Sequence, residues 1–439
     1  MCKLIGKFFL TLLYYFKLKS QNKLMDNVFQ GIDSGILGAF LALTLVVGIQ
    51  AGRNLESFRV YAVGNKDFPT AVLTASILAT WMTGGVLFYD LSNFYNYGLV
   101  LVLITMGGEG INFLLTGRVL AIRMHKFLHY LSVGEAMGDL YGSAVRIITA
   151  ISGILGRLGY ISIQFQIIGQ MLALAFNLQG PQAMVIAATL VILYSSFGGV
   201  NAVTLTDVLQ FVTFSLFIPI LALIIWKHLP SAREQVAVVL TKEPFDTQQI
   251  IDWDTKSIMS FNIFIYCLIP SLGPAMFQRI LMAKDVYQSR QAFTYAAGIN
   301  TLILAVVAWL AILLRTSNAD LEPSSLILHV VDTYAYVGLK GFIVVGVMAL
   351  AMSTADSELN ASSVLATHDL LRLLFPSLKV SVTLARISSA LIGVAGLALA
   401  LQGGDMLQLI LTTVSFYRPI VTVPLLLAIF GFRSSPRAC

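Results

Sequence analysis

Runs of about 20 apolar residues recur along almost the whole chain, and each is long enough to cross the hydrocarbon core of a bilayer. The chain of 439 residues is 57% hydrophobic and 11% charged, whereas a soluble domain has about 25% charged residues. A soluble core cannot absorb that much apolar surface. Lipid requires every backbone polar group to be satisfied within the protein, and the runs lack the alternation of barrel strands. The sequence therefore predicts an all-α polytopic membrane protein.

The apolar runs predict about eleven transmembrane helices, each with the length that a bilayer requires. In chain order they are Ile32–Ala51, Thr70–Tyr89, Tyr97–Ala121, Ile147–Phe176, Pro181–Ser195, Leu205–Trp226, Ile258–Met276, Tyr295–Leu314, Gly338–Ala366, Val380–Leu401 and Leu407–Phe430. A hydrophobic and basic segment at 1–30 precedes them and fits a helix lying at the membrane interface. An external loop is expected at 227–257, and a short cytoplasmic tail at 431–439.

Lys and Arg alternate between the predicted short loops. The loop after the first helix holds Arg53, Arg59 and Lys66, whereas the next loop, 89–96, holds none. A later loop on the same side as the first holds Arg279 and Lys284. By the positive-inside rule the basic loops are cytoplasmic, so the N-terminus lies outside and the C-terminus in the cytoplasm. We attribute the net charge of +6 to this topology and not to nucleic-acid binding.

The run "ATWMTGG" places polar and small residues in the middle of the second predicted helix. It contains Thr80, Trp81 and Thr83, followed by the pair Gly84 and Gly85. Glycine disfavours a helix by about 1 kcal/mol relative to alanine and permits unwinding. The pair therefore predicts either a broken helix whose backbone groups line a cavity, or a close approach of a neighbouring helix.

The ninth predicted helix carries the stretch "ALAMSTADSELN" at 349–360. Ser353, Asp356 and Asn360 lie near one stripe of this helix, with Thr354 beside them. One hydroxyl pair could bond back to the preceding turn, but so many polar groups on one flank favour a functional face. Adjacent hydroxyls, together with the carbonyls of an unwound helix, would supply the oxygen ligands that a hard monovalent cation prefers.

Three further charged residues stand at informative positions. Asp207, at the cytoplasmic end of the sixth predicted helix, suits either a helix N-cap or a place on an ion route. Glu109 and Arg157 lie deep in their helices, where they could pair with each other or line a route. The sequence contains no nucleophile triad, phosphate loop or metal-ligand cluster, so an enzyme is the least favoured class of protein.

Four segments, in this chain order, resemble motifs of the sodium/solute symporter family, and most closely those of its proline-permease branch. They are "YAVGNKDFPTAVLTASILATWMTGG", "YSSFGGVNAVTLTDVLQF", "MFQRILMAKDVYQSRQAF" and "MSTADSELNASSVLATHDL". The resemblance implies a LeuT-type 5+5 core of two inverted repeats, at 70–226 and 258–430, preceded by one extra helix at 31–52.

The resemblance also implies a sodium site and an ion route. The sodium ligands would be the carbonyls of Ala79, Met82 and Leu350 and the hydroxyls of Ser353 and Thr354. Asp207 would lie on the intracellular ion route. The solute would bind between two broken helices, in a cavity formed by Thr80, Trp81, Thr83, Gly84, Pro270, Gly273 and Asp356.

One residue departs from the proline-permease pattern. That branch has an aspartate where this chain has Trp81, and an indole supplies no charge for cation or substrate binding. Two roles stay open for Trp81, stacking on a ligand or plugging the cavity. In the seventh predicted helix, Pro270, Gly273 and Pro274 are expected to break the helix.

The expected function is sodium-coupled import of a small organic solute, amino acid-like or related, by alternating access, in a bacterial cytoplasmic membrane. Sodium is the expected coupling ion, without another cofactor. One alternative is a transporter-like sensor module that signals to a histidine-kinase partner. Another is a truncated, inactive transporter.

Overall fold

The computed structural model describes residues 31–53, 55, 57–246, 255–270, 272–322, 326–403 and 417–432, and every regular element in these ranges is helical. The segment at 1–30 and nearly all of the tail at 431–439 lie outside the described residues, and so does much of the last predicted membrane helix.

The α-helices are α2 (Gly31–Ala51), α3 (Phe58–Val63), α4 (Thr70–Trp81), α5 (Gly84–Leu115), α6 (Val133–Tyr141), α7 (Ser143–Phe176), α8 (Gly180–His228), α9 (Ala232–Val239), α10 (Thr255–Leu268), α11 (Pro274–Leu281), α12 (Val286–Ser317), α13 (Leu326–Tyr334), α14 (Leu339–Val364), α15 (Arg372–Leu374), α16 (Val382–Gln402) and α18 (Val423–Ile429). Turns of π-helix occupy Thr116–Ala121, Leu365–Leu371 and Arg418–Thr422, and a 3-10 turn occupies Met124–Lys126.

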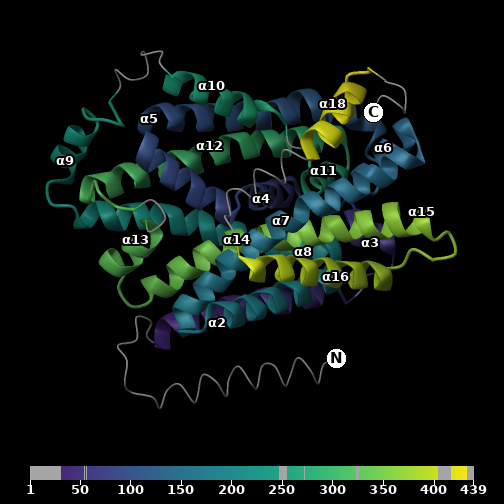
Figure 1. Cartoon of the computed structure of the whole chain (residues 1–439), viewed down its shortest axis with the longest axis horizontal. Coiled ribbons are helices and arrows are strands. Elements are labelled where there is room, and N and C mark those ends of the chain that lie inside the picture. The colour runs from purple at the N-terminus through teal and green to yellow at the C-terminus, as the bar shows by residue number, and fades with distance from the viewer. Residues whose placement is uncertain are drawn as a thin grey trace.

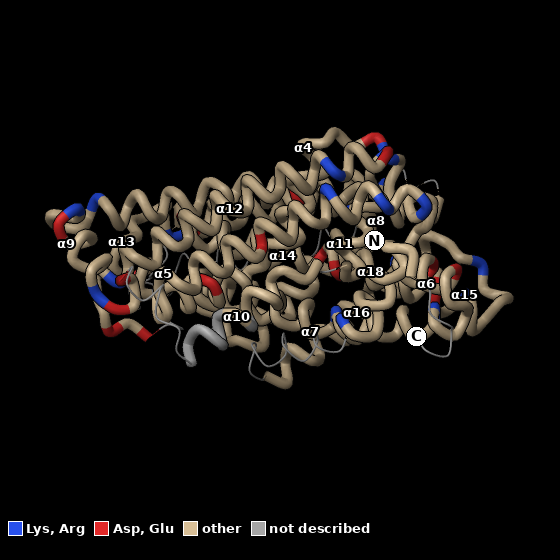
Figure 2. The backbone as a smooth tube through the Cα atoms, turned by 90° about the horizontal axis from the view of Figure 1, so that it is seen from above, with Lys and Arg blue, Asp and Glu red and all other residues tan. Residues whose placement is uncertain are grey.

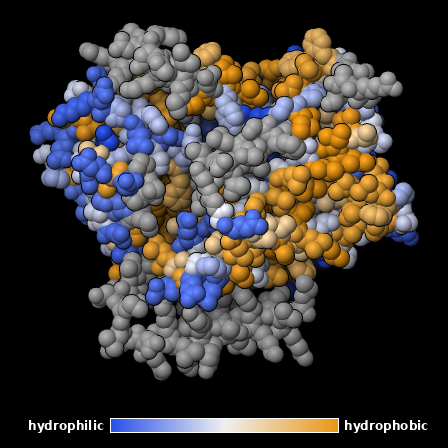
Figure 3. All heavy atoms as spheres, viewed as in Figure 1, coloured by the Kyte–Doolittle hydropathy of each residue, from blue (hydrophilic) through white to orange (hydrophobic). Residues whose placement is uncertain are grey.

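Most of the long helices run side by side along one direction (Figure 1). In the described part of the chain, 7 helical stretches are long and apolar enough to cross a membrane. Charged residues gather at the two ends of the helices, near α9 and α13 at one end and near α6 and α15 at the other (Figure 2). Hydrophobic residues cover a broad area of one face (Figure 3). This distribution agrees with the predicted all-helical, multi-pass membrane protein, while the number of eleven spans stays a prediction.

Two pairs of predicted helices are continuous in the structure except at one glycine each. The sequence predicts a loop at 89–96, but this segment is helical within α5, and the chain leaves helical geometry at Gly98 (φ 65°). A β-carbon at Gly98 would lie 1.9 Å from the carbonyl oxygen of Pro244, so the kink requires glycine. Likewise α8 spans the fifth and sixth predicted helices and is kinked at Gly199 (φ 56°). A single kinked residue replaces each expected loop.

The first expected helix break is confirmed, and it lies two residues before the glycine pair. α4 ends at Trp81, and Met82 and Thr83 have extended backbone with ψ values of 92° and 157°. Gly84 begins α5, and the Thr83 hydroxyl caps that helix by accepting a hydrogen bond from the Val86 amide at 2.9 Å. The break therefore comes from the cap, while the glycine allows close packing at the start of α5.

The second expected break is also confirmed. α10 ends at Leu268 and α11 begins at Pro274, with Pro270 and Gly273 in between. The Asn112 side chain of α5 donates hydrogen bonds to the carbonyls of Cys267 (2.7 Å) and Ile269 (3.1 Å). These bonds satisfy carbonyl groups that the interrupted helix leaves without amide partners.

α14 forms the centre of the molecule. Every residue from Ile343 to Val364 is buried, including the whole polar stretch at 353–360. The helix packs most extensively against α8 and α7, and it also contacts α2, α16, α4 and α11. Polar groups on α14 are therefore held among other helices, which is where a membrane protein can retain them.

Candidate ion and solute site

The end of α4 presents backbone carbonyls inside the protein. The Met82 amide closes the last turn by donating to the Leu78 carbonyl at 2.8 Å. The following carbonyl, that of Ala79, has no helical amide four residues later because the helix has ended. Ala79 is fully buried, so this carbonyl must find its partner on a neighbouring helix.

That partner is the hydroxyl pair of α14. The Ser353 hydroxyl donates to the Ala79 carbonyl at 2.8 Å and lies 3.0 Å from the Leu350 carbonyl. The Thr354 hydroxyl donates to the same Leu350 carbonyl at 3.2 Å. Four of the five expected sodium ligands thus meet in one junction between α4 and α14, and Met82 is buried directly beyond Ala79 at the break. All are uncharged oxygen donors of the kind that a hard monovalent cation accepts.

Asp207 lies inside α8, beyond the Gly199 kink, and is not an N-cap. Its carboxylate forms an ion pair with Arg279 of α11, with Oδ2 and Nη2 3.0 Å apart and both side chains fully buried. It also accepts a hydrogen bond from Ser76 of α4. The predicted place of Arg279 in a cytoplasmic loop is therefore wrong. A loop cation would be solvated, whereas this cation is neutralised inside the helix bundle.

Arg279 joins several helices at the end of α4. Its Nε donates to the Thr80 hydroxyl at 3.1 Å, and its Nη2 donates to the Ser357 hydroxyl of α14 at 2.5 Å. The Thr80 and Ser357 oxygens are 3.2 Å apart. We call the set Arg279, Asp207, Ser76, Thr80 and Ser357 the arginine network. The network contains one positive and one negative charge and holds α4, α8, α11 and α14 together.

The polar stripe of α14 is divided among its neighbours. Asp356 faces α8, where its Oδ2 accepts hydrogen bonds from Tyr194 (2.9 Å) and Thr206 (3.2 Å). Asn360 accepts a hydrogen bond from Gln278 of α11 at 2.8 Å. Ser353 is the member of the stripe that reaches the α4 break. One helical stripe thus serves three different helices, which its spacing in the sequence does not reveal.

Glu109 and Arg157 do not pair with each other. Glu109 Oε2 accepts hydrogen bonds from the Trp81 indole (3.0 Å) and from Asn300 of α12 (2.9 Å). Arg157 of α7 pairs with Glu358 of α14 at 3.1 Å. The sequence predicts the depth of these two charges, but the facing helix decides their partners, and Glu109 and Arg157 face different neighbours.

The Arg157–Glu358 pair lies against the second helix break. The Arg157 guanidinium stands over the rings of Tyr160 and Tyr417, 5.1 and 5.3 Å from their centroids. A β-carbon at Gly273 would lie 2.3 Å from an Arg157 nitrogen, so the glycine makes room for the cation. The positive charge of Arg157 is therefore already engaged by a carboxylate and two aromatic rings.

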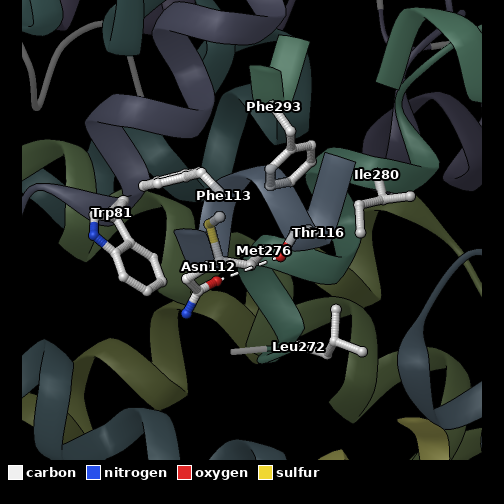
Figure 4. A pocket seen from close by; sticks show the side chains of 8 residues that line it. All are labelled: Trp81, Asn112, Phe113, Thr116, Leu272, Met276, Ile280 and Phe293. Carbon is white, nitrogen blue, oxygen red and sulfur yellow. Dashed lines mark hydrogen bonds between the residues drawn. The ribbon is translucent and has the colours of Figure 1, made fainter. Parts of the chain in front are cut away.

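A small cavity lies beside the two breaks, with a volume of about 10 Å³, which is room for about one water molecule. Its lining residues are Trp81, Asn112, Phe113, Thr116, Leu272, Met276, Ile280 and Phe293. Trp81 and Phe113 meet edge to face with centroids 5.1 Å apart. Figure 4 shows the indole nitrogen on the side of the ring away from the other labelled side chains. The carbon part of the ring thus borders the cavity, and the N–H points to Glu109.

Among the residues expected to form the solute cavity, Trp81 alone lines this cavity of the described structure. Thr80 belongs to the arginine network, and Asp356 faces α8. The Thr83 hydroxyl caps α5. Gly84 packs on α14, where an added β-carbon would lie 3.2 Å from that of Ala351. The remaining two, Pro270 and Gly273, lie in the second break, next to the lining residue Leu272.

Sequence reasoning missed two contacts that shape this region. One is the pairing of Arg279 with Asp207. Arg279 and the adjacent Gln278 are both buried on the eight-residue helix Pro274–Leu281. The other is the contact of Asn300 with Glu109. A buried asparagine in the apolar helix α12 is a signal that such a contact exists, but its partner cannot be read from the sequence.

Two broken helices that meet central polar groups inside a multi-pass helical bundle are the architecture of a secondary transporter. The chain belongs to the sodium:solute symporter family, whose model matches residues 61–437. Members of this family and the similar proteins described next are transporters and not enzymes.

Among curated relatives, the chain is 24% identical over 400 residues to the high affinity choline transporter 1 of Homo sapiens, an alignment that covers 82% of this chain. It is 22% identical over 366 residues to a putative sodium-dependent multivitamin transporter of Drosophila melanogaster, over 77% of this chain. The chain spans 66% and 59% of the lengths of these two relatives. Neither is a proline permease, so the branch suggested by the motifs stays a prediction.

Two solved structures share the fold. A Na⁺-coupled sialic acid symporter in a substrate-bound, outward-open state superposes with a TM-score of 0.80 at 17% identity, covering 93% of this chain and 88% of that one. A manganese transporter of Eremococcus coleocola superposes with a TM-score of 0.58 at 14% identity, covering 87% and 83%. At these identities the likeness concerns the fold alone.

Proposed function

We propose that this protein is a sodium-coupled symporter that imports a small organic solute by alternating access. The observation that carries the proposal is the contact between the Ser353 hydroxyl and the Ala79 carbonyl at the end of α4. It brings oxygen donors of two helices together at a helix break in a buried junction. Membership in the sodium:solute symporter family and the fold shared with a Na⁺-coupled symporter support sodium as the ion.

In this proposal sodium is bound by the carbonyls of Ala79, Met82 and Leu350 and the hydroxyls of Ser353 and Thr354. An ion held by both helices stabilises the arrangement in which α4 and α14 are joined, and its release allows them to separate. A membrane potential of about 100 mV contributes about 2.3 kcal/mol per inward charge. One sodium ion then supports roughly fiftyfold solute accumulation, at about 1.4 kcal/mol per decade.

We further propose that the core consists of two inverted five-helix repeats, at 70–226 and 258–430. The position of the two breaks supports this division. The α4–α5 break falls near the start of the first repeat, and the α10–α11 break falls near the start of the second. The helix α2 precedes the core, the N-terminus lies outside, and the basic loops are cytoplasmic.

Asp207 would lie on the route by which sodium leaves toward the cytoplasm. The arginine network places its carboxylate next to Ser76, one turn before Ala79 on the same helix. The solute would bind near Trp81, between the two breaks.

The proposal is tested by the thermal stability of purified protein in sodium and in potassium. Wild type is expected to gain stability in sodium, by about 2.7 kcal/mol at a concentration one hundred times the dissociation constant. The double variant Ser353→Ala/Thr354→Ala should lose this gain. As a matched control, Thr213→Ala/Ser215→Ala removes two hydroxyls from α8 and should keep it. No sodium effect in folded wild type, or an equal effect in the Ser353 double variant, would contradict the proposal.

A further inference from the structure

Two acidic side chains of α5 are buried without a basic partner among the described residues: Glu109, which contacts Trp81, and Asp90, which interacts with Glu109. Asp90 and Glu109, on either side of the Gly98 kink, are 5% and 8% exposed. In the described part of the chain, neither carboxylate lies within ion-pair distance of an Arg, Lys or His, whereas Asp207 and Glu358 both do. Asp90 Oδ2 also lacks a hydrogen-bond partner there. Burial and their mutual repulsion make the charges of Asp90 and Glu109 costly, and a bound cation would offset this cost.

The Trp81 indole connects this negative charge to the cavity. Its N–H donates to Glu109 at 3.0 Å, which fixes the plane of the ring. A hydrogen bond from the indole to a carboxylate draws electron density onto the ring, so a cation on its face is attracted more strongly. The Phe113 ring, 5.1 Å from Trp81 by centroid, adds a second aromatic surface to the same wall.

The buried cations at the two breaks, in contrast, have acidic partners in the described part of the chain. Arg157, a buried cation at the second break, is already paired with Glu358 and lies against two tyrosine rings. Arg279, which is fully buried, is paired with Asp207. A carboxylate or phosphate would have to displace one of these partners to reach either cation. Arg418 has no carboxylate partner among the described residues, but its guanidinium stands over the Tyr266 ring, 3.9 Å from the centroid, and does not line the cavity.

We infer that the solute carries a positive charge, an amine or quaternary ammonium group, which binds against Trp81 and Phe113 and is neutralised by Glu109 and Asp90. This inference rests on the proposed symport function and specifies its solute. The cavity holds only about one water molecule in this conformation. Solute entry therefore requires Trp81 and Met276, both partly exposed, to move; the flexible methionine side chain suits that role.

The test compares matched probes that differ only in charge. The cationic probe is choline, and the neutral probe is its carbon isostere, in which a tert-butyl group replaces the trimethylammonium group. Both are titrated in sodium against purified wild type, Glu109→Gln and Trp81→Phe, with thermal stability as the readout. The glutamine keeps an acceptor for the indole N–H and removes the charge. Glu135→Gln on α6 makes the same chemical change at a residue whose carboxylate contacts Leu131 and His368 and not Trp81.

Wild type and Glu135→Gln are expected to bind the cation at least about tenfold tighter than the isostere. Glu109→Gln should lose most of this preference while its affinity for the isostere is unchanged. Trp81→Phe should reduce the preference for the cation by a smaller factor than Glu109→Gln. Equal affinities for the two probes in wild type, no effect of the cation, or a preference that survives Glu109→Gln would overturn the inference. If sodium still raises the thermal stability of wild type, any of these results contradicts the cationic solute and not sodium-coupled symport. Absence of the sodium gain in folded protein refutes symport independently of the probes.

Discussion

The adjacent residues Thr80 and Trp81 connect the end of α4 to two polar groups of opposite character. Thr80 belongs to the arginine network, in which Arg279 and Asp207 cancel each other's charge at 3.0 Å. Trp81 belongs to what we call the tryptophan group, with Glu109, Asp90 and Asn300, in which the acids have no basic partner among the described residues. One group pairs its two charges, and the other contains two acids without a basic partner.

The difference separates two uses of buried charge in a membrane protein. A network whose two charges are paired holds helices in one arrangement, and removal of either partner lowers the stability. A negative group without a partner is costly until a cation arrives, so it suits a place where a cation binds and leaves. The candidate sodium junction of Ala79 and Ser353 lies on the same turn of α4 as both groups. Movement of this turn would therefore alter the arginine network, the tryptophan group and the candidate sodium junction.

The largest effect is expected from breaking the arginine network. Asp207→Asn leaves the Arg279 cation buried without its carboxylate, which should lower the free energy of unfolding by about 3–5 kcal/mol. Thermal unfolding in detergent measures this loss. The double variant Asp207→Asn/Arg279→Gln removes both charges and should recover much of it. A double variant as unstable as the single one would show that the charges are not what matters.

A second prediction concerns the junction between the two groups. Ser353→Ala removes the hydroxyl that bonds to the Ala79 carbonyl, which should cost about 1 kcal/mol in potassium. In saturating sodium the same variant should lose up to about 2.7 kcal/mol more, because the ion no longer stabilises it. Parallel melts in the two salts separate these losses. If the deficit were the same in both salts, Ser353 would be a structural residue and not a ligand.

A third prediction concerns the break itself. Thr83→Ala removes the N-cap of α5 and should lower the free energy of unfolding by about 1 kcal/mol. Thr83→Ser keeps the capping oxygen and should be close to wild type in the same thermal unfolding experiment. Equal losses in the two variants would show that the cap does not hold the break in place.

The smallest effect on stability is expected in the tryptophan group. Glu109→Gln keeps an acceptor for Trp81 and Asn300 and removes the repulsion with Asp90. Without solute, its free energy of unfolding should stay within about 0.5 kcal/mol of wild type or rise. Thermal unfolding of Glu109→Gln and Asp207→Asn under the same conditions measures the difference between the two variants. A loss as large as that of Asp207→Asn would show that Glu109 has a cationic partner, and the contrast between the two groups would be wrong.

Much of the fold can be predicted from the sequence because it depends on local signals. Apolar run length predicts the helices, and Pro270, Gly273 and Pro274 predict the second break. The first break is predicted from the polar run beginning at Thr80, but its position is set by the Thr83 cap. The segment 89–96 has the composition of a loop yet is helical, because one glycine with positive φ suffices to turn the chain.

The site is less predictable because its contacts join distant segments. Ser353 stands on a recognisable polar stripe, but spacing alone does not say that Ser353 faces α4 while Asp356 faces α8. Glu109 bonds to Trp81, 28 positions away, and not to the equally deep Arg157. Partner choice depends on which helix faces which, and a single sequence contains no record of that.

The most direct test of the account is equilibrium binding of radioactive sodium to the purified protein, in wild type and in Ser353→Ala. We predict saturable binding to wild type that potassium does not displace, strong weakening in Ser353→Ala, and tighter binding when a cationic solute occupies the tryptophan group. Absence of saturable sodium binding in folded wild type, or unchanged binding in Ser353→Ala, would contradict a sodium site between α4 and α14.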